Sequence, residues 1–226
     1  MKVFILCGGE GTRLRPYTYK NPKPMLMVNG KPILEIIIEH LKKHGFKEFI
    51  LTVGYLKEKI TDYFKDGSKF GVKIEYAVED APLGTAGSTI ASKKKLKETF
   101  VVLMGDAIID VDLDKMIANH KKSKCIATVG VKRHKTKIEY GVVNIEKGFV
   151  KSFAEKPIVE NMINTGIYVF EPRVFDFIRE KEDFAKNVFP RLLEKGEKIN
   201  AYELKGIWID IGQKEDYERL KKEMEK

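Results

Sequence analysis

The first 124 residues alternate between short apolar runs and helical patterns. Apolar, β-rich runs at residues 3–6, 49–53, 72–78 and 100–104 predict strands. Between them, apolar positions recur at helical spacing in three segments, which cover residues 32–45, 57–64 and 85–96. Strands that alternate with helices build parallel sheets whose faces the helices cover. The pattern therefore predicts an α/β fold with a mainly parallel, mixed sheet.

The pattern changes after about residue 124. Strands are predicted at 125–132, 140–145, 149–153 and 163–170, with little helix between them. Two helices (173–180 and 184–195), two short strands (200–204 and 207–211) and a charged helix from residue 214 follow. No repeat, linker or low-complexity segment divides the chain. We expect a single domain, 1–226, in which a lobe of about 1–124 and a lobe of about 125–226 share one sheet.

Composition limits the classes of function. The chain has 226 residues, of which 43% are hydrophobic, enough for a substantial core. No apolar run approaches the roughly 20 residues that span a bilayer, and the amino terminus lacks the pattern of a signal peptide, so we expect a cytoplasmic protein. The two cysteines, Cys7 and Cys125, match no metal or disulfide pattern. The formal charge is +9, but lysines are mixed with glutamates along the chain, which predicts a solvated surface and no binding to nucleic acid or membrane.

The strongest local signal is a glycine-rich loop after the first strand. It runs Leu6-Cys7-Gly8-Gly9-Glu10-Gly11-Thr12-Arg13-Leu14. Glycines let backbone N–H groups approach phosphate oxygens. The loop lacks the Gly-Lys-Ser/Thr ending of a P-loop, and Leu14 occupies the third glycine position of a dinucleotide loop. Prolines at 16, 22 and 24 also oppose an immediate helix. By itself, the loop leaves the class of phosphate ligand open.

Further motifs accompany this loop over essentially the whole chain. In chain order they are Gly8-Gly9-x-Gly11-Thr12-Arg13-Leu14-x-Pro16, Pro22-Lys23-Pro24-Met25-Leu26, Gly30-Lys31-Pro32, Pro82-Leu83-Gly84-Thr85-Ala86-Gly87, Gly105-Asp106, Tyr140-Gly141-Val142-Val143, Glu155-Lys156-Pro157, Asn164-Thr165-Gly166-Ile167-Tyr168 and Trp208-Ile209-Asp210-Ile211-Gly212. This set resembles the sugar-phosphate nucleotidylyltransferases (sugar-nucleotide pyrophosphorylases), and among them the short mannose or heptose 1-phosphate guanylyltransferases. Two positions depart from the family pattern: Cys7 replaces a usual alanine, and Gln213 a usual threonine or similar small residue. Neither departure should affect the chemistry.

The resemblance implies a Rossmann-like (GT-A-like) nucleotidyltransferase fold with a sugar-binding lobe. It implies transfer of a nucleotidyl group from a nucleoside triphosphate to a sugar 1-phosphate, with Mg²⁺ as cofactor and pyrophosphate as product. The attacking phosphate oxygen is already anionic, so the reaction needs no general base. The barrier is repulsion between two anions, which cations and positioning must overcome.

The resemblance also assigns residues to this chemistry. Arg13 would clamp the triphosphate, and Lys23, held between two prolines, would neutralise the α-phosphate region. Asp106 and Asp210 would bind the metal, because carboxylates are preferred Mg²⁺ ligands. The implied nucleotide-binding residues are Leu6, Gly8, Gly9, Gly11, Thr12, Glu79, Gly84 and Thr85. The implied sugar-phosphate ligands are Gly141, Glu155, Lys156 and Asn164.

Glu79 suggests which base is bound. A carboxylate only accepts hydrogen bonds, and guanine presents two adjacent donors that it could accept together. Uracil and thymine present one N–H between two carbonyls, although backbone groups at Gly84 could supply the donors that they need. We therefore expect GTP and a sugar such as mannose 1-phosphate, and keep glucose-1-phosphate thymidylyl- or uridylyltransferase as the alternative.

Another class of function is a non-catalytic sugar-nucleotide sensor, but such a protein should lack the phosphate cations and metal carboxylates that this sequence retains. The sequence ends soon after the last motif, so we expect a monofunctional protein. It leaves a homo-oligomer possible.

Overall fold

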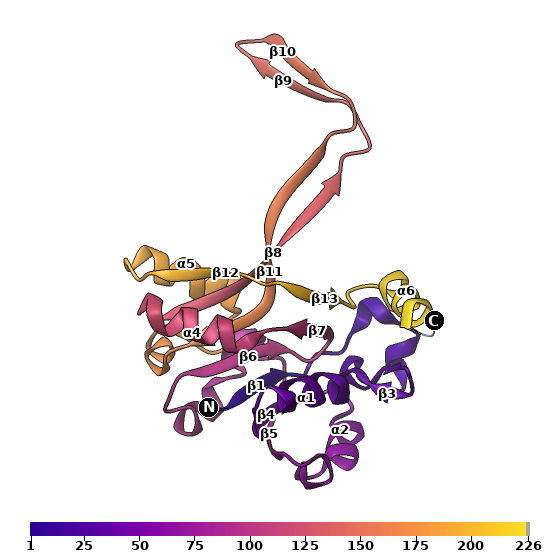
Figure 1. Cartoon of the computed structure of the whole chain (residues 1–226), viewed down its shortest axis with the longest axis vertical. Helices are drawn as coiled ribbons and strands as arrows, with labels where there is room; N and C mark the ends of the chain where they lie inside the picture. Colours follow the sequence, from indigo (N-terminus) through magenta and orange to yellow (C-terminus); the bar gives the residue numbers. More distant parts are fainter. Residues whose placement is uncertain (225–226) are drawn as a thin grey trace.

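The computed structural model describes residues 1–224 and contains a seven-stranded mixed sheet with helices on both faces (Figure 1). The strand order is β12-β8-β11-β6-β1-β4-β5. Strands β1, β4, β5 and β6 run parallel to one another, β11 runs antiparallel to β6 and β8, and β12 runs parallel to β8. The bounds are Val3–Leu6 for β1, Glu48–Val53 for β4, Lys73–Val78 for β5, Phe100–Met104 for β6, Ala127–Lys137 for β8, Ile158–Phe170 for β11 and Ile199–Glu203 for β12. Both halves of the chain thus contribute to one sheet, and the predicted α/β class is confirmed.

Three short strand pairs supplement this sheet. They are β2 (Met27–Val28) with β3 (Lys31–Pro32), β7 (Ala107–Val111) with β13 (Gly206–Asp210), and β9 (Val142–Glu146) with β10 (Phe149–Ala154). The α-helices are α1 (Ile33–Lys43), α2 (Lys57–Phe64), α3 (Gly84–Gly87), α4 (Leu113–Ser123), α5 (Phe189–Glu194) and α6 (Lys214–Met224). Of these elements, β2, β3, β7 and α4 were not predicted from the sequence.

Alternation along the central strands divides the core into two layers. In β1, Ile5 faces the layer that contains Ile37 of α1, whereas Phe4 faces the opposite layer with Phe170. All four side chains are fully buried. Because successive side chains of a strand point to opposite faces, an apolar strand must be covered on both sides. The continuous apolar run 3–6 therefore holds β1 at the centre of the sheet.

Three predicted helices differ in the structure. The helix expected at 184–195 begins as a π-helix, Phe184–Val188, which precedes α5. Residues 85–96 divide into α3 and a 3₁₀ helix, Ile90–Lys95, because the hydroxyls of Ser88 and Thr89 donate to the backbone carbonyls of Gly84 and Ala86 and so compete with the helix. The helix expected at 173–180 is a 3₁₀ helix, Pro172–Phe177. It has no side-chain cap, because the carboxylate of Glu171 instead accepts from Thr99 Oγ1 at 2.8 Å.

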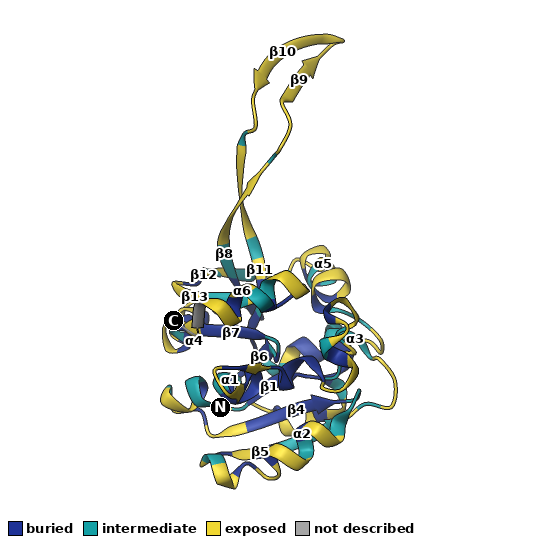
Figure 2. Ribbon diagram, turned by 90° about the vertical axis from the view of Figure 1, so that its right-hand side faces the viewer, coloured by how far each residue is buried: buried dark blue, intermediate teal, exposed yellow. Residues whose placement is uncertain are grey.

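Strands β8 and β11 continue beyond the sheet as a two-stranded ribbon (Figure 1). The ribbon ends in the β9–β10 hairpin, whose residues are all exposed. Figure 2 shows this extension standing away from the body, with few buried positions beyond its base. We call residues 132–163 the arm. None of the described helices is both long and apolar enough to cross a membrane.

Candidate functional site

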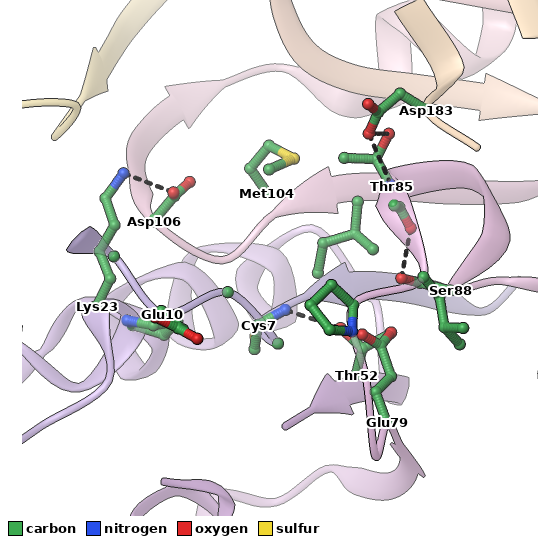
Figure 3. Close-up of a pocket in the computed structure, with 18 of the residues that line it drawn as sticks. Cys7, Glu10, Lys23, Thr52, Glu79, Thr85, Ser88, Met104, Asp106 and Asp183 are labelled. Atoms are coloured by element: carbon green, nitrogen blue, oxygen red, sulfur yellow. Dashed lines mark hydrogen bonds and ion pairs between the residues drawn. The ribbon is translucent and has the colours of Figure 1, made fainter. Parts of the chain in front are cut away.

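A pocket of about 330 Å³ opens where the loops after β1 and β6 meet α3 (Figure 3). Ten of the residues assigned from the sequence line this pocket. They lie in the glycine loop, in the segment with the proline-flanked Lys23, at the ends of β5 and β6, and in α3. They are Leu6, Gly8, Gly9, Gly11, Arg13, Lys23, Glu79, Gly84, Thr85 and Asp106. Ligands of open α/β sheets bind beyond the carboxyl ends of the strands, and the pocket has this position.

The glycine loop leaves its backbone open to a ligand. A Cβ atom at Gly9 would meet nothing within 4 Å, so there is open space beside this residue. Gly11 has φ +63°, and a Cβ there would lie 2.9 Å from Thr18 Cγ2. This left-handed turn needs glycine and starts the 3₁₀ helix Thr12–Leu14, which places the exposed Arg13 at the pocket. The loop can therefore present both N–H groups and a guanidinium to phosphate oxygens.

Lys23 is the buried cation of the site. It opens a short 3₁₀ helix, Lys23–Met25, with Pro22 before it, and only 7% of the residue is exposed. Its ammonium donates to Asp106 Oδ2 at 2.6 Å and lies 3.7 Å from Asp210 Oδ1. A buried ammonium is costly unless it is paired, and here two carboxylates pair with it.

The two carboxylates come together through a strand pair that joins distant parts of the chain. Asp106 precedes β7, Asp210 ends β13, and the antiparallel register places Asp210 opposite Ala107. Burial, with repulsion from Asp106 as a smaller cause, raises the pKa of the half-exposed Asp210 carboxyl, while Lys23 acts to lower it. Two hard oxygen ligands that repel each other beside an open pocket fit the donor set of Mg²⁺.

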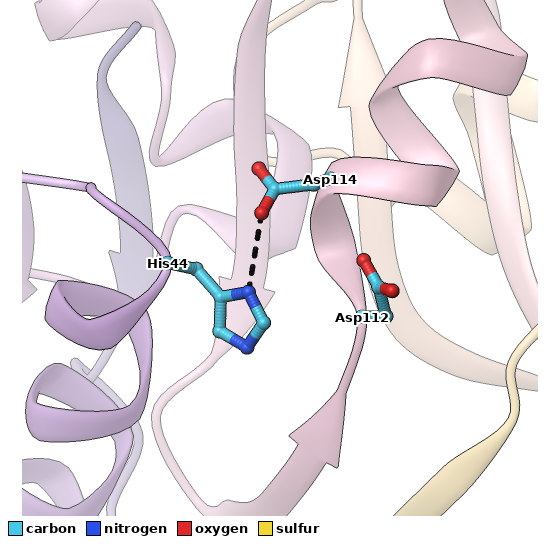
Figure 4. A group of neighbouring side chains, drawn as sticks. All are labelled: His44, Asp112 and Asp114. Atoms are coloured by element: carbon cyan, nitrogen blue, oxygen red, sulfur yellow. Dashed lines mark hydrogen bonds and ion pairs between the residues drawn. The ribbon is translucent and has the colours of Figure 1, made fainter.

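A separate group of His44, Asp112 and Asp114 also lies within metal-binding distance on another part of the surface (Figure 4). Each member already has a local partner. Asp112 caps α4 by accepting from Lys115 N at 3.0 Å, and His44 Nδ1 lies 3.2 Å from Asp114 Oδ2. Capping and ion pairing account for this cluster, so it carries no second metal site.

The opposite end of the pocket holds a carboxylate with an available acceptor. Glu79 Oε1 is buried and has no hydrogen-bond partner among the described residues. Burial raises the pKa of the Glu79 carboxyl above its ordinary value. A Cβ atom added at Gly8 would lie 2.9 Å from Glu79 Oε2, so the loop packs closely against this side chain. An unpaired buried acceptor favours a ligand that brings N–H donors.

Four residues that line the pocket lie outside the motifs identified in the sequence. One is Ser88, whose hydroxyl donates to the carbonyl of Gly84 at 2.6 Å. Thr52 Oγ1 accepts from the backbone N–H of Cys7 at 2.9 Å and so holds the start of the glycine loop. Asp183 Oδ1 accepts from Thr85 N at 3.0 Å, which fixes α3 from the second half of the chain. Met104 ends β6 beside them (Figure 3). Only Asp183 carried a signal, as a capping residue type before a helical segment.

The assigned sugar-phosphate residues do not join this pocket. Gly141, Glu155 and Lys156 lie in the arm, where a Cβ atom on Gly141 would come 2.9 Å from Glu155 Oε2. Asn164 lies at the base of the arm and donates to the hydroxyl of Tyr168 at 2.8 Å. Thr12 is exposed beside the pocket but is not part of its lining. The structure thus brings together the residues that the sequence assigns to the triphosphate and the metal, and it separates them from Glu155 and Lys156.

Known proteins resemble this chain over most of its length. Residues 2–226 match the family model of the nucleotidyl transferases. The D-glycero-alpha-D-manno-heptose 1-phosphate guanylyltransferase of Campylobacter jejuni is 42% identical over 96% of this chain and 97% of its own length. The UTP–glucose-1-phosphate uridylyltransferase of Synechocystis sp. is 40% identical over 96% of this chain, which spans 61% of that relative.

A solved structure gives the same result for the fold. HddC from Yersinia pseudotuberculosis, crystallised in a complex with GMP-PN, matches with a TM-score of 0.79 at 27% identity, and the match covers 98% of each chain. The match to the family model extends over the glycine loop, Lys23, Asp106 and Asp210 alike. The chain therefore belongs to the nucleotidyl transferase family.

Proposed function

We propose that the protein joins GTP to mannose 1-phosphate, or to a similar sugar 1-phosphate, and releases pyrophosphate. The observation that carries this proposal is the position of the Lys23 ammonium between Asp106 and Asp210 at a pocket whose other wall is the glycine loop. A buried ammonium beside two carboxylates, with an exposed guanidinium and a glycine-rich loop at the same pocket, suits phosphoryl chemistry.

The reaction balances without a general base. A phosphate oxygen of the sugar 1-phosphate attacks the α-phosphorus, the bond from this phosphorus to the oxygen that bridges to the β-phosphate breaks, and pyrophosphate leaves with the electron pair. Arg13 and Lys23 reduce the repulsion between the two anions, and the amides of the glycine loop orient the triphosphate. Asp106 and Asp210 would hold Mg²⁺, which supplies further positive charge to the phosphates.

The choice of GTP rests on Glu79. Its unpaired buried oxygen can accept from guanine, whose N1–H and 2-amino group present two donors side by side. The relatives that are guanylyltransferases and the HddC complex with GMP-PN support this choice. The alternative is a uridylyl- or thymidylyltransferase for glucose 1-phosphate, which the 40% identity to the Synechocystis uridylyltransferase favours. We place the reaction in the cytosol, where the two free cysteines would remain reduced.

A pyrophosphate-release assay tests the proposal. ATP, CTP, GTP, UTP and dTTP are each combined with mannose 1-phosphate and glucose 1-phosphate, and GTP with mannose 1-phosphate should turn over fastest. Excess chelator should abolish release. Asp106→Asn should reduce turnover strongly, whereas Asp110→Asn, the same change at a side chain that is 74% exposed, should not. Binding of nucleotide without any turnover would instead indicate a sensor and reject the transferase.

A further inference from the structure

The arm is built as one continuous ribbon. Its ladder runs from the pair Asn164–Val131 at the base to the pair Ile158–Lys137, and Ile138 N donates to Pro157 O at 3.0 Å just beyond it. Beyond that point the β9–β10 hairpin forms the tip. No other described element covers this tip, and every residue of its two strands is exposed.

The arm exposes apolar side chains that a solvated hairpin does not need. Ten of the seventeen exposed large hydrophobic residues of the described chain lie between residues 140 and 162. Tyr140 and Phe149 are 79% exposed, and Phe153 is 74% exposed. An isolated two-stranded hairpin is marginal in water, and clustered exposed apolar groups mark contact surfaces. The tip is therefore shaped to pack against another surface.

Contacts at the base fix the direction in which the arm leaves the body. Lys132 Nζ donates to Gly206 O at 2.7 Å, and Arg133 bridges Glu203 of β12 and Glu160 of the arm. A bulge in β11 is also held, since Trp208 Nε1 donates to the carbonyl of Thr165 at 2.9 Å. These contacts hold the base of the arm in a direction in which no residue of the arm lines the pocket of its own chain, which leaves the tip free to contact a different molecule.

A second copy of this chain is the partner that fits. Glu155 and Lys156 lie at the joint between stem and tip, roughly 25 Å along the ribbon from Asn164 at about 3.3 Å per residue. No residue of the arm lines the pocket of its own chain. If the proposed function is right, the pocket still needs groups for the sugar phosphate, and an identical chain carries them in its arm.

The size and edges of the arm also suit a symmetric partner. Its 32 residues exceed the 20–30 or so that each side of a stable interface supplies. Beyond the sheet, the outer edges of β8 and β11 have no neighbouring strand among the described residues. Such edges invite pairing, and a two-fold axis lets the same ribbon cover both copies at once.

We propose that two copies form an intertwined dimer in which each arm packs on the other copy and delivers Glu155 and Lys156 to its pocket. The assembly is closed, because each copy gives one arm and receives one. The dimer itself requires only the apolar tip, whereas delivery of the two polar residues rests on the proposed function.

Light scattering during gel filtration tests the dimer without reference to activity. The 226-residue chain should elute with twice the mass of one 25.9 kDa copy. The double variant Phe149→Ser with Phe153→Ser should shift it to a monomer of unchanged melting behaviour in the body. Leu193→Ser, at an apolar side chain on α5 that is also exposed (61%), should leave the dimer intact. A monomeric wild-type protein would overturn the proposal that two copies exchange their arms.

Complementation tests the delivery. Copies with Lys23→Ala and copies with Lys156→Ala are co-expressed with different tags, and the mixed dimer is purified. Each parent dimer should be nearly inactive. In the mixed dimer an intact pocket receives an intact arm at one site, so turnover should return to about half of the wild-type value per dimer. A mixed dimer as inactive as its parents would show that each arm serves its own chain and would overturn the proposal.

The two hypotheses fail in different ways. Absence of pyrophosphate release from the wild-type protein, over the whole substrate matrix, rejects the proposed function and with it the delivery. The dimer and its dependence on Phe149 and Phe153 would still be decided by mass alone.

Discussion

Replacing Glu79 with glutamine tests the contact to the base. The change keeps the shape of the side chain but converts one of its two acceptors to a donor. Glu79 Oε1 is buried without a partner, and Glu79 Oε2 packs near Gly8, so the side chain has little room to turn away. In the variant, an N–H group of guanine would lie against the N–H group of the glutamine amide. A carbonyl of uracil or thymine would instead accept a hydrogen bond from that amide.

The expected magnitude follows from these hydrogen bonds. Loss of one bond to a charged acceptor costs about 1.5–3 kcal/mol, which lowers kcat/KM for GTP by about 10- to 150-fold. A new neutral bond contributes about 0.5–1.5 kcal/mol, which raises kcat/KM for UTP or dTTP by about 2- to 12-fold. The ratio of GTP to pyrimidine triphosphate should therefore fall by at least about 20-fold.

The assay measures pyrophosphate release for GTP, UTP and dTTP with one sugar phosphate. Asp80→Asn is the matched control, because it removes the same charge from an exposed neighbour outside the pocket lining. It should leave all three rates within about twofold, as expected for a surface substitution. An unchanged preference in Glu79→Gln would refute the base contact, as would a wild-type protein that already prefers UTP or dTTP.

Three further predictions concern stability and electrostatics. Gly84→Ala should destabilise the protein by about 2–5 kcal/mol in urea unfolding, because φ at Gly84 is +74° and the new Cβ would lie 2.5 Å from Glu182 O. This carbonyl oxygen also accepts hydrogen bonds from two backbone N–H groups, which the clash would disturb. In the control Gly9→Ala, the new Cβ meets nothing within 4 Å, so stability should change by less than about 0.5 kcal/mol. Lys23→Met should lower kcat/KM at least about 100-fold, and Lys23→Arg should retain more activity because it keeps the charge; equal losses in the two variants would contradict the electrostatic role. Burial raises the pKa of Glu79 in the folded state above its pKa in the unfolded chain. The ionised carboxylate therefore destabilises the fold fully at pH values above the folded-state pKa. This destabilisation decreases as the pH falls and is absent below the pKa of the unfolded chain. Glu79→Gln should therefore raise the melting temperature more at about pH 7 than at about pH 4, and a larger gain at the lower pH would reverse the sign of this reasoning.

The body of the fold could be predicted because local periodicity decides it. The apolar run of β6 and the helical spacing of α1 are bounded by glycine or proline, and the structure has both elements where they were expected. Strand β7 was missed, since the apolar residues 107–111 follow the turn at Gly105 and Asp106 so closely that the segment resembled a loop between strand and helix.

The site was predictable where residues are close in sequence. The glycine loop, Arg13 and Lys23 lie within 18 residues, and every residue of this loop except Thr12 lines the pocket together with Lys23. Asp183 was missed because its contact with Thr85 joins positions 98 residues apart. The direction of the arm was also beyond local patterns, since it depends on long-range contacts such as Lys132 with Gly206.

The two ends of the arm have an evolutionary consequence. Strands β8 and β11 leave the sheet as neighbours, with Val131 opposite Asn164, so the chain departs and returns at one place. A short turn could therefore replace the whole excursion without disturbing the strands beneath it. The segment that carries Glu155 and Lys156 is in this sense an interchangeable module, and under the proposed function a lineage that replaces it would change its preference for the sugar phosphate while the pocket of the body stays the same.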